Sequence, residues 1–333
     1  MVLIDHIASL KKQSFQKLII GAALKDFQSI EDYAYYFTHA QANVIDISAF
    51  PHSVISAKKG IERALLQDPL LKEPLIMVSV NIGEDPHFRR IELDVESCTE
   101  CLDCLPTCPS GAFSVIARKA EPDEAISKSR HCEEQSDEAI SPKDALDDGQ
   151  FSYNIDLCFG CANCLPACTD KALSFKNWNS FDTQSLKELI ELGASAIELH
   201  LNHDLEGFKN FYKDLPKSFL LESFCIGSNT ANKNDLHQAV DSIIESVFTK
   251  HEKDYRFVIQ TDGIPLSGAR DLKIENKDQL SIDKAKLVID YIHDKYSNLK
   301  KQIFIQLAGG TDETSLKKAL SQKISVSGVA IGS

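Results

Sequence analysis

The sequence lacks the features of a membrane-spanning, exported or nucleic-acid-binding chain. No apolar run approaches the roughly 20 residues that a spanning helix needs, and the start, MVLIDHIASLKKQSF, has no signal-peptide core. Asp and Glu outnumber Lys and Arg by 49 to 36, and the net charge of −13 argues against a phosphate-binding surface. We therefore expect a cytoplasmic protein that binds neither nucleic acid nor membranes.

Disulfides are also not expected, although the chain has 10 cysteines. Eight of them fall into two short runs, CTECLDCLPTCP and CFGCANCLPACT, in a chain without an export signal. Clustered cysteines in a reducing compartment favour metal ligation over disulfide bonds.

Both runs have the spacing C-x2-C-x2-C-x3-C, which is typical of bacterial ferredoxins. In that pattern three closely spaced thiolates bind one [4Fe–4S] cluster and the fourth binds the other cluster. The sequence thus predicts two clusters, with the ligands Cys98, Cys101, Cys104 and Cys168 for one and Cys158, Cys161, Cys164 and Cys108 for the other. A zinc site would instead show two ligand pairs separated by a longer loop.

Short alternating segments precede and follow each cysteine run, as expected of two ferredoxin-like halves. They are IELDVESC and SYNIDLC before the first cysteines, and SGAFSV and DKALSF after the last. Between the halves, residues 114–150 are charged and poor in large apolar side chains, so we expect a polar loop or frayed helix there. The predicted iron–sulfur domain spans residues 93–175.

Elsewhere, short apolar runs alternate with segments of helical spacing, which predicts an α/β fold with parallel strands. Helical spacing is clearest from Ser185, Asp235 and Ser281. The eight expected strands are KLIIGAA from Lys17, NVIDIS from Asn43, LIMVSV from Leu75, AIELHL from Ala196, FLLESFCI from Phe219, RFVIQT from Arg256, IFIQLA from Ile303 and GVAIGS from Gly328.

Eight such units predict a (β/α)8, TIM-like barrel formed by residues 1–92 and 176–333, with the ferredoxin-like α+β domain inserted after the third strand. The sequence ends directly after the last expected strand, which leaves open a barrel that is incomplete at its C-terminus. The insertion point is a βα-loop, on the face where barrels place their active sites.

Glycines follow the last two expected strands and resemble the phosphate-binding loops of many barrels. The residues are Gly309, Gly310 and Thr311 after strand seven, and Gly332 and Ser333 at the end of strand eight. Such glycines let backbone N–H groups approach a phosphate, as in FMN or another small phosphorylated ligand. A plain Gly-Gly turn is the alternative.

Four further side chains have competing interpretations. Glu198 and His200 occupy alternate positions of one strand, so they either point into the barrel or brace its loops, and we favour bracing. Cys225 lies in the apolar run SFLLESFCIGS and is expected to be a small buried hydrophobic residue. Cys132 lies in the polar loop and is expected to be an incidental exposed thiol.

The strings NIGEDPHFRR, QTDGIPLSG and FIQLAGGT, together with the two cysteine runs, resemble the light-dependent period protein A family of iron–sulfur proteins. The resemblance covers most of the chain. It implies iron–sulfur chemistry and a link to redox sensing that feeds light input to the circadian clock.

Within these strings, the resemblance draws attention to His87 and Arg89 after the third strand and to Asp262 after the sixth. His87 and Arg89 could neutralise an anionic ligand or the negative charge of a cluster, and Asp262 could bind a ligand hydroxyl. For His87 a hydrogen-bonded loop anchor is an equal alternative.

Three functions remain open at this point. The first is electron transfer or redox sensing with a redox protein as electron donor or partner. The second is an oxidoreductase in which the clusters relay electrons to a flavin or another phosphate-bearing ligand in the barrel. The third is a protein-interaction scaffold in which the clusters are only structural.

Overall fold

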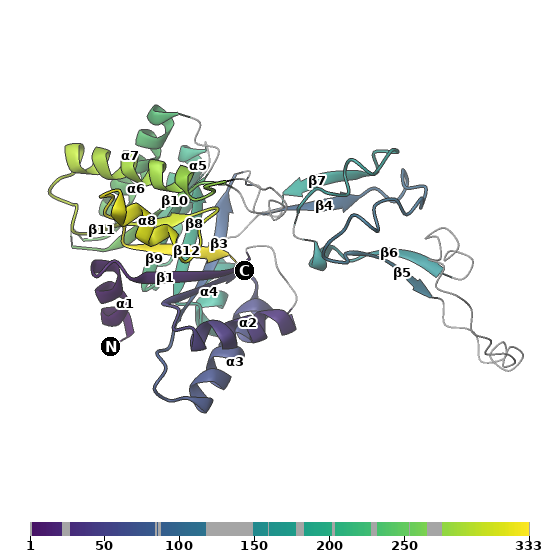
Figure 1. Ribbon diagram of the computed structural model, residues 1–333, viewed down its shortest axis with the longest axis horizontal. Coiled ribbons are helices and arrows are strands. Elements are labelled where there is room, and N and C mark those ends of the chain that lie inside the picture. Colours follow the sequence, from purple (N-terminus) through teal and green to yellow (C-terminus); the bar gives the residue numbers. More distant parts are fainter. Residues whose placement is uncertain are drawn as a thin grey trace, which may run out of the picture. The chain divides into compact units, whose positions relative to one another are not determined.

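The computed structural model describes two compact units (Figure 1). One comprises Met1–Arg89 and Asn177–Ser333, and the other comprises Arg90–Lys176, which we call the cysteine unit. The described residues are 2–21, 27–83, 85, 88–117, 149–158, 160–177, 183–201, 204–227, 232–252, 254–264 and 275–332.

The first unit is a closed barrel of eight parallel strands, so the predicted TIM-like fold is confirmed. The ring is complete, because β1 pairs with both β12 and β2. In their order around the barrel the strands are β1 (Phe15–Gly21), β12 (Gly328–Gly332), β11 (Ile303–Ala308), β10 (Phe257–Asp262), β9 (Leu221–Ile226), β8 (Ala196–Leu201), β3 (Leu75–Ile82) and β2 (Val44–Ser48). Each corresponds to one of the eight apolar runs expected from the sequence.

Helices surround this ring (Figure 1). They are α1 (Val2–Lys11), α2 (Phe27–His39), α3 (Pro51–Gln67), α4 (Thr183–Leu192), α5 (Leu205–Asp214), α6 (Lys233–Lys250), α7 (Gln279–Lys295) and α8 (Ser315–Ser321). Side-chain caps define where two of these helices begin. The Asn232 side chain accepts hydrogen bonds from the first backbone N–H groups of α6, and the Asp204 side chain accepts one from Gly207 of α5.

Two apolar layers stabilise the barrel. Every residue of β2, β3, β8, β9, β10 and β11 is buried, as expected of parallel strands covered on both faces. The outer layer packs strand residues against the helices. The inner layer consists of residues near the starts of the strands, such as Phe15, Val44 and Leu221, and Leu10 of α1 packs against them.

The helices α2 and α3 approach each other closely at Gly60. A Cβ atom built there would lie 2.1 Å from the Glu31 carbonyl oxygen, so only glycine fits without moving a helix. This contact secures α2, which follows β1, against the outside of the barrel.

The cysteine unit consists of two similar halves whose strands pair crosswise. The strand before the first cysteine run, β4 (Arg89–Leu93), pairs with the strand after the second, β7 (Leu173–Asn177). Likewise β5 (Phe113–Ala117) pairs antiparallel with β6 (Gly149–Tyr153), and the short helix η3 (Ile155–Leu157) follows β6. Equivalent residues of the two halves differ by 60 positions, as Cys98 and Cys158 do.

The polar segment between the halves is shorter than the 114–150 expected from the sequence. Residues up to Ala117 belong to β5, and β6 begins at Gly149, because their backbones pair in register. Residues 118–148, including Cys132, lie outside the described part of the chain. Among the described helices, none is long and apolar enough to cross a membrane.

Candidate functional site

The two cysteine loops share an unusual backbone conformation. Glu100 and Leu102 in the first loop have positive φ angles of 54° and 65°, and Gly160 and Ala162 at the equivalent positions of the second have 73° and 68°. Positive φ is costly for residues other than glycine and persists mainly where the surroundings over-determine it, often at functional sites. The repeated strain indicates that both loops are shaped for the same task.

The first group of cysteines, quartet A, contains three residues of the first loop and one of the second: Cys98, Cys101, Cys104 and Cys168. These four line one cavity together with Leu93, Phe151 and Leu173. Burial raises the pKa of Cys104 to about 11, and the charges of Cys101, Cys98 and Cys168 add to the rise. The structure thus brings the last cysteine of the second run to the triplet of the first.

The second group, quartet B, has the reciprocal composition: Cys158, Cys161, Cys164 and Cys108. Burial raises the pKa of Cys164 to about 12, and Cys158, Cys161 and Cys108 are the cysteines whose charges raise it further. The eight motif cysteines are all free thiols in the structure. Their neighbourhoods match the exchange of fourth cysteines that the spacing suggests, while their role as iron ligands stays a prediction.

The spacing of the cysteines fits a cluster better than a single ion. Four thiolates at about 2.3 Å from one zinc ion would lie about 3.8 Å from each other. Among the described residues, one group of three potential ligands has all its ligand atoms within 4.8 Å of one another, and it consists of Glu198, His200 and Cys225. No three described cysteines of either quartet lie that close. The thiols of each quartet are therefore spread more widely than the ligands of a single zinc ion would be.

Hydrogen bonds reach the sulfur atoms, as they do in iron–sulfur proteins. The Ile91 backbone N–H donates to Cys158 Sγ over 3.4 Å, and Ser110 Oγ lies 3.4 Å from Cys108 Sγ. Burial opposes ionisation of Cys108, but hydrogen bonds from Ser110 and from the backbone of Ala112 outweigh it and lower its pKa. Such donors stabilise thiolates, the form that binds metal.

Three stacked rings connect the two quartets. Phe151, which lines the cavity of quartet A, stacks on Phe113 with ring centroids 5.9 Å apart. Phe113 stacks on Tyr153 at 4.7 Å, and the Tyr153 hydroxyl reaches both the Ile91 carbonyl and Cys158 of quartet B. The rings fill the core of the unit between its two cysteine groups.

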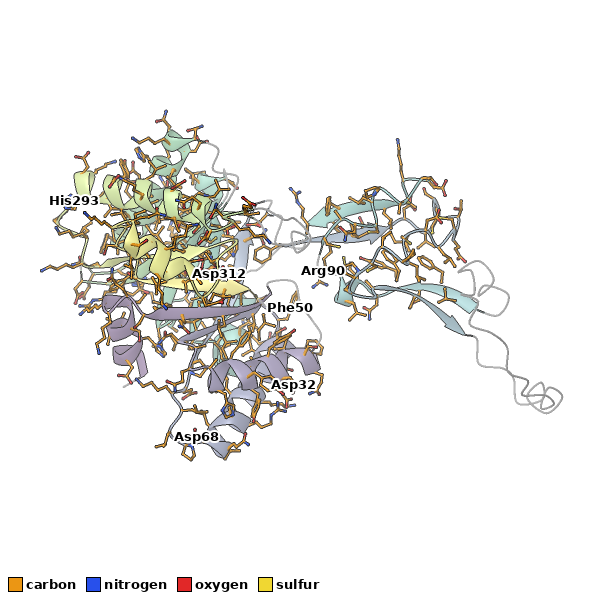
Figure 2. All side chains as sticks on the ribbon, in the orientation of Figure 1. Asp32, Phe50, Asp68, Arg90, His293 and Asp312 are labelled. Atoms are coloured by element: carbon orange, nitrogen blue, oxygen red, sulfur yellow. The ribbon has the colours of Figure 1, made fainter. Side chains whose placement is uncertain are left out.

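Quartet B also has a buried cation nearby. This cation is Arg90, which is labelled in Figure 2. It is 1% exposed and donates to the Ile155 carbonyl oxygen over 2.9 Å, at the start of η3. Its charge lies close enough to Tyr153 to act on the pKa of that hydroxyl. Leu93 takes the place of Tyr153 in the other half, so the two quartets differ in their polar surroundings.

The predicted phosphate-binding glycines are packed against protein. A Cβ atom on Gly309 would lie 2.0 Å from Asp262 Oδ1, and one on Gly310 would lie 2.8 Å from the Lys277 carbonyl oxygen. Both residues have positive φ, 70° and 82°. Thr311 donates its hydroxyl to the Ala330 carbonyl oxygen. In this structure these residues join the ends of β10, β11 and β12, and their binding of a ligand stays a prediction.

Of the remaining predicted site residues, the structure describes Asp262, Gly332 and Arg89. Asp262 is buried as the last residue of β10, Gly332 ends β12, and Arg89 begins β4. His87 and Ser333 lie outside the described residues, as do parts of the motif strings around them.

A buried polar layer inside the barrel was not expected from the sequence. Lys17 on β1 is fully buried and forms ion pairs with Glu198 on β8 and, at 3.3 Å, with Asp46 on β2. Ser223 and Gln260 donate to the two oxygens of Glu198 over 2.8 and 3.0 Å. Burial disfavours the charged form of Glu198, but Lys17 and His200 outweigh it and hold its pKa below the usual value.

Above this layer, His200 links three other groups. Its Nδ1 lies 3.1 Å from Asp85 Oδ2, its Nε2 lies 3.1 Å from Glu198 Oε1, and Cys225 also contacts the ring. Burial lowers the pKa of His200, but Cys225 and Asp85 outweigh it and raise the value well above normal. Thus Glu198 and His200 both point into the barrel, and His200 also braces Asp85.

Cys225 is fully buried, as expected, but among polar rather than apolar side chains. Burial raises its pKa to about 11. The sequence does contain an indication of the polar layer. Lys17, Asp46 and Glu198 are single charged residues within otherwise apolar strands, and alternate strand positions face the barrel interior.

Fold and cysteine loops together define an α/β-barrel protein with a duplicated cysteine-rich unit between its third and fourth barrel strands. The chain belongs to the light dependent period A family: residues 188–333 match the model of the family described as the light dependent period A C-terminal domain. It is 30% identical over 263 residues to the protein Light dependent period A of Synechococcus elongatus. That match covers 76% of this chain and 61% of the cyanobacterial protein.

A search of solved structures finds similarity to QR15, an aldolase, with a TM-score of 0.43 and 10% sequence identity. The alignment covers 96% of this chain and 90% of the aldolase. The barrel assignment therefore rests on the strand pairing itself.

Proposed function

We propose that this chain is an iron–sulfur protein that binds one [4Fe–4S] cluster in each cysteine quartet and uses them for electron transfer or redox sensing. The observation that carries the proposal is the reciprocal composition of the quartets, each formed by three cysteines of one loop and the last cysteine of the other. Cys98, Cys101, Cys104 and Cys168 would hold one cluster, and Cys158, Cys161, Cys164 and Cys108 the other.

A bound cluster supplies one-electron chemistry, and this chain supplies the surroundings that tune it. The N–H of Ile91 and the hydroxyl of Tyr153 stabilise negative charge on Cys158. The stacked rings of Phe151, Phe113 and Tyr153 lie between the quartets, which supports exchange of electrons within the unit. A redox protein is the partner class that this function requires.

The test begins with protein purified under anaerobic conditions. We expect about eight iron atoms and eight sulfides per chain, and EPR signals of reduced cubanes after addition of dithionite. A colourless protein with stoichiometric zinc would refute the proposal. Clusters that cannot be reduced in an electrochemical titration would leave only a structural role.

Two matched variants test the exchange of fourth ligands. Cys108→Ser should alter the EPR signal of the cluster in quartet B, and Cys168→Ser that of the cluster in quartet A. Cys132→Ser, outside both motifs, is the control and should leave both signals unchanged. If Cys108→Ser instead altered the cluster bound by Cys98, Cys101 and Cys104, each loop would hold its own cluster.

A further inference from the structure

The barrel has a second group of metal-ligating side chains, remote in sequence from the cysteine runs. Glu198 and His200 are on β8, and Cys225 is the register partner of His200 on the adjacent strand β9. Their ligand atoms all lie within 4.8 Å of one another, and all three residues are buried. We propose that Glu198, His200 and Cys225 bind a divalent ion of the zinc type, at a site independent of the iron–sulfur clusters.

The distances fit a small tetrahedral ion. With bonds of about 2.0–2.2 Å to nitrogen and oxygen, two such ligands of one zinc ion lie about 3.4 Å apart. His200 Nε2 and Glu198 Oε1 are 3.1 Å apart, so little movement is needed to place an ion between them. Cys225 Sγ lies within 4.8 Å of the other two ligand atoms, and its bond to zinc would be about 2.3 Å long.

The surroundings of His200 are those of a metal ligand. Histidine ligands commonly donate their second ring N–H to a carboxylate, which fixes the ring and makes the ligating nitrogen more basic. Asp85 Oδ2 lies 3.1 Å from His200 Nδ1 and can accept that N–H. The Nε2 lone pair then faces Glu198, and Cys225 contacts the same ring. A metal ion replaces the proton that otherwise joins Nε2 to the carboxylate.

Glu198 can accept an ion without losing its other partners. A carboxylate offers about four lone-pair positions. Lys17 and Ser223 occupy two of them on Oε2, and Gln260 occupies one on Oε1. The fourth position faces His200 and can bind the metal. The contacts with Lys17, Ser223 and Gln260 hold the carboxylate in its orientation.

The ligand set also indicates the metal class and its use. One thiolate, one imidazole and one carboxylate form a mixed set of the kind that zinc and similar borderline ions accept. Three protein ligands leave one tetrahedral position for water or a substrate oxygen, as in catalytic zinc sites. His200 and Cys225 lie toward the carboxyl ends of their strands, where barrel enzymes bind substrates.

The experiment uses the full chain, purified anaerobically with its iron, and adds zinc alone. Zinc and iron are counted together by mass spectrometry, and zinc K-edge X-ray absorption reports the zinc ligands. We expect one zinc per chain, with one sulfur at about 2.3 Å and the remaining ligands at about 2.0–2.1 Å. A lone sulfur excludes the cysteine quartets, and loss of that sulfur in Cys225→Ser but not in Cys132→Ser assigns it to Cys225, the barrel's single cysteine.

Variants separate the site from a general effect on folding. Cys225→Ser should weaken zinc binding at least tenfold without changing the iron content or the circular dichroism spectrum. Asp85→Asn should weaken it by about 10- to 100-fold, as loss of a histidine's supporting carboxylate does. Ser242→Ala is the control and should retain zinc, because Ser242 is a buried serine of helix α6, outside the strands that carry the three ligands.

Two outcomes overturn the proposal. One is a folded wild-type chain that binds zinc no better than Cys225→Ser. The other is zinc surrounded by sulfur alone, which places the ion in a cysteine quartet. A chain without iron would instead count against the iron–sulfur function, and the zinc ligands would still report on the barrel.

Discussion

The barrel and the cysteine unit differ in what holds them together. Apolar layers line both faces of the barrel strands. Among its described residues, the cysteine unit has one small cluster of six buried residues, and two of these, Cys158 and Cys164, are cysteines. A core this small contributes little stability, and small domains usually need disulfides or metals as a supplement. The barrel can therefore fold by apolar burial alone, whereas the cysteine unit depends on what its thiolates bind.

The largest expected effect follows from removing iron. Chelation under anaerobic conditions should unfold the cysteine unit and leave the barrel folded, since metal binding supplies folding free energy. Hydrogen exchange followed by mass spectrometry should show loss of protection at β4–β7 and unchanged protection at the barrel strands. Equal protection of the cysteine unit with and without iron would show that its apolar core suffices.

The next effect concerns the buried ion pairs of Lys17 at the centre of the barrel. Lys17→Met removes the cation that Glu198 and Asp46 share, and it should lower the free energy of unfolding by about 3–5 kcal/mol. Urea titration followed by circular dichroism measures this change. Lys286→Met, which breaks an exposed ion pair with Asp290, is the control and should cost less than about 0.5 kcal/mol.

The smallest effect contrasts the two halves of the cysteine unit. Tyr153→Phe removes a hydroxyl beside Cys158, and one lost hydrogen bond of about 0.5–1.5 kcal/mol corresponds to a reduction potential lower by about 20–60 mV. Potentiometric titration with EPR detection should show the shift for the cluster of quartet B only. A shift of both clusters, or of neither, would contradict this local role.

The sequence predicted the barrel well, because its strands are continuous apolar runs such as LIMVSV and IFIQLA, which few other folds require. It did not predict the polar layer within the barrel. Lys17, Asp46 and Glu198 are 181 positions apart at most, and only the closing of the ring brings them together. Pairwise contacts between distant strands carry no local periodicity. The charged residues within apolar strands therefore indicated a buried polar layer, but not which side chains would pair.

For the cysteines, the spacing of each run suggested which residues meet, and the structure brings those residues together. For the glycines after β11, the structure shows a packing reason for glycine that the sequence did not, and their binding of a phosphate stays a prediction. Gly309 and Gly310 have the composition of a phosphate loop, but in the structure their missing side chains make room for Asp262 and Lys277. Composition alone does not distinguish a glycine that admits a ligand from one that admits a neighbouring segment.

The pairing of β5 with β6 allows the connection between these two strands to vary in length. Ala117 and Gly149 are register partners, although residues 118–148 separate them in the sequence. Closure entropy grows only with the logarithm of loop length, so a connection of this size costs about 1.6 kcal/mol more than one of five residues. Side chains such as Phe113 and Tyr153, rather than a tight turn, set the register. The hairpin can thus absorb or lose long stretches of connecting sequence while the cysteines keep their places.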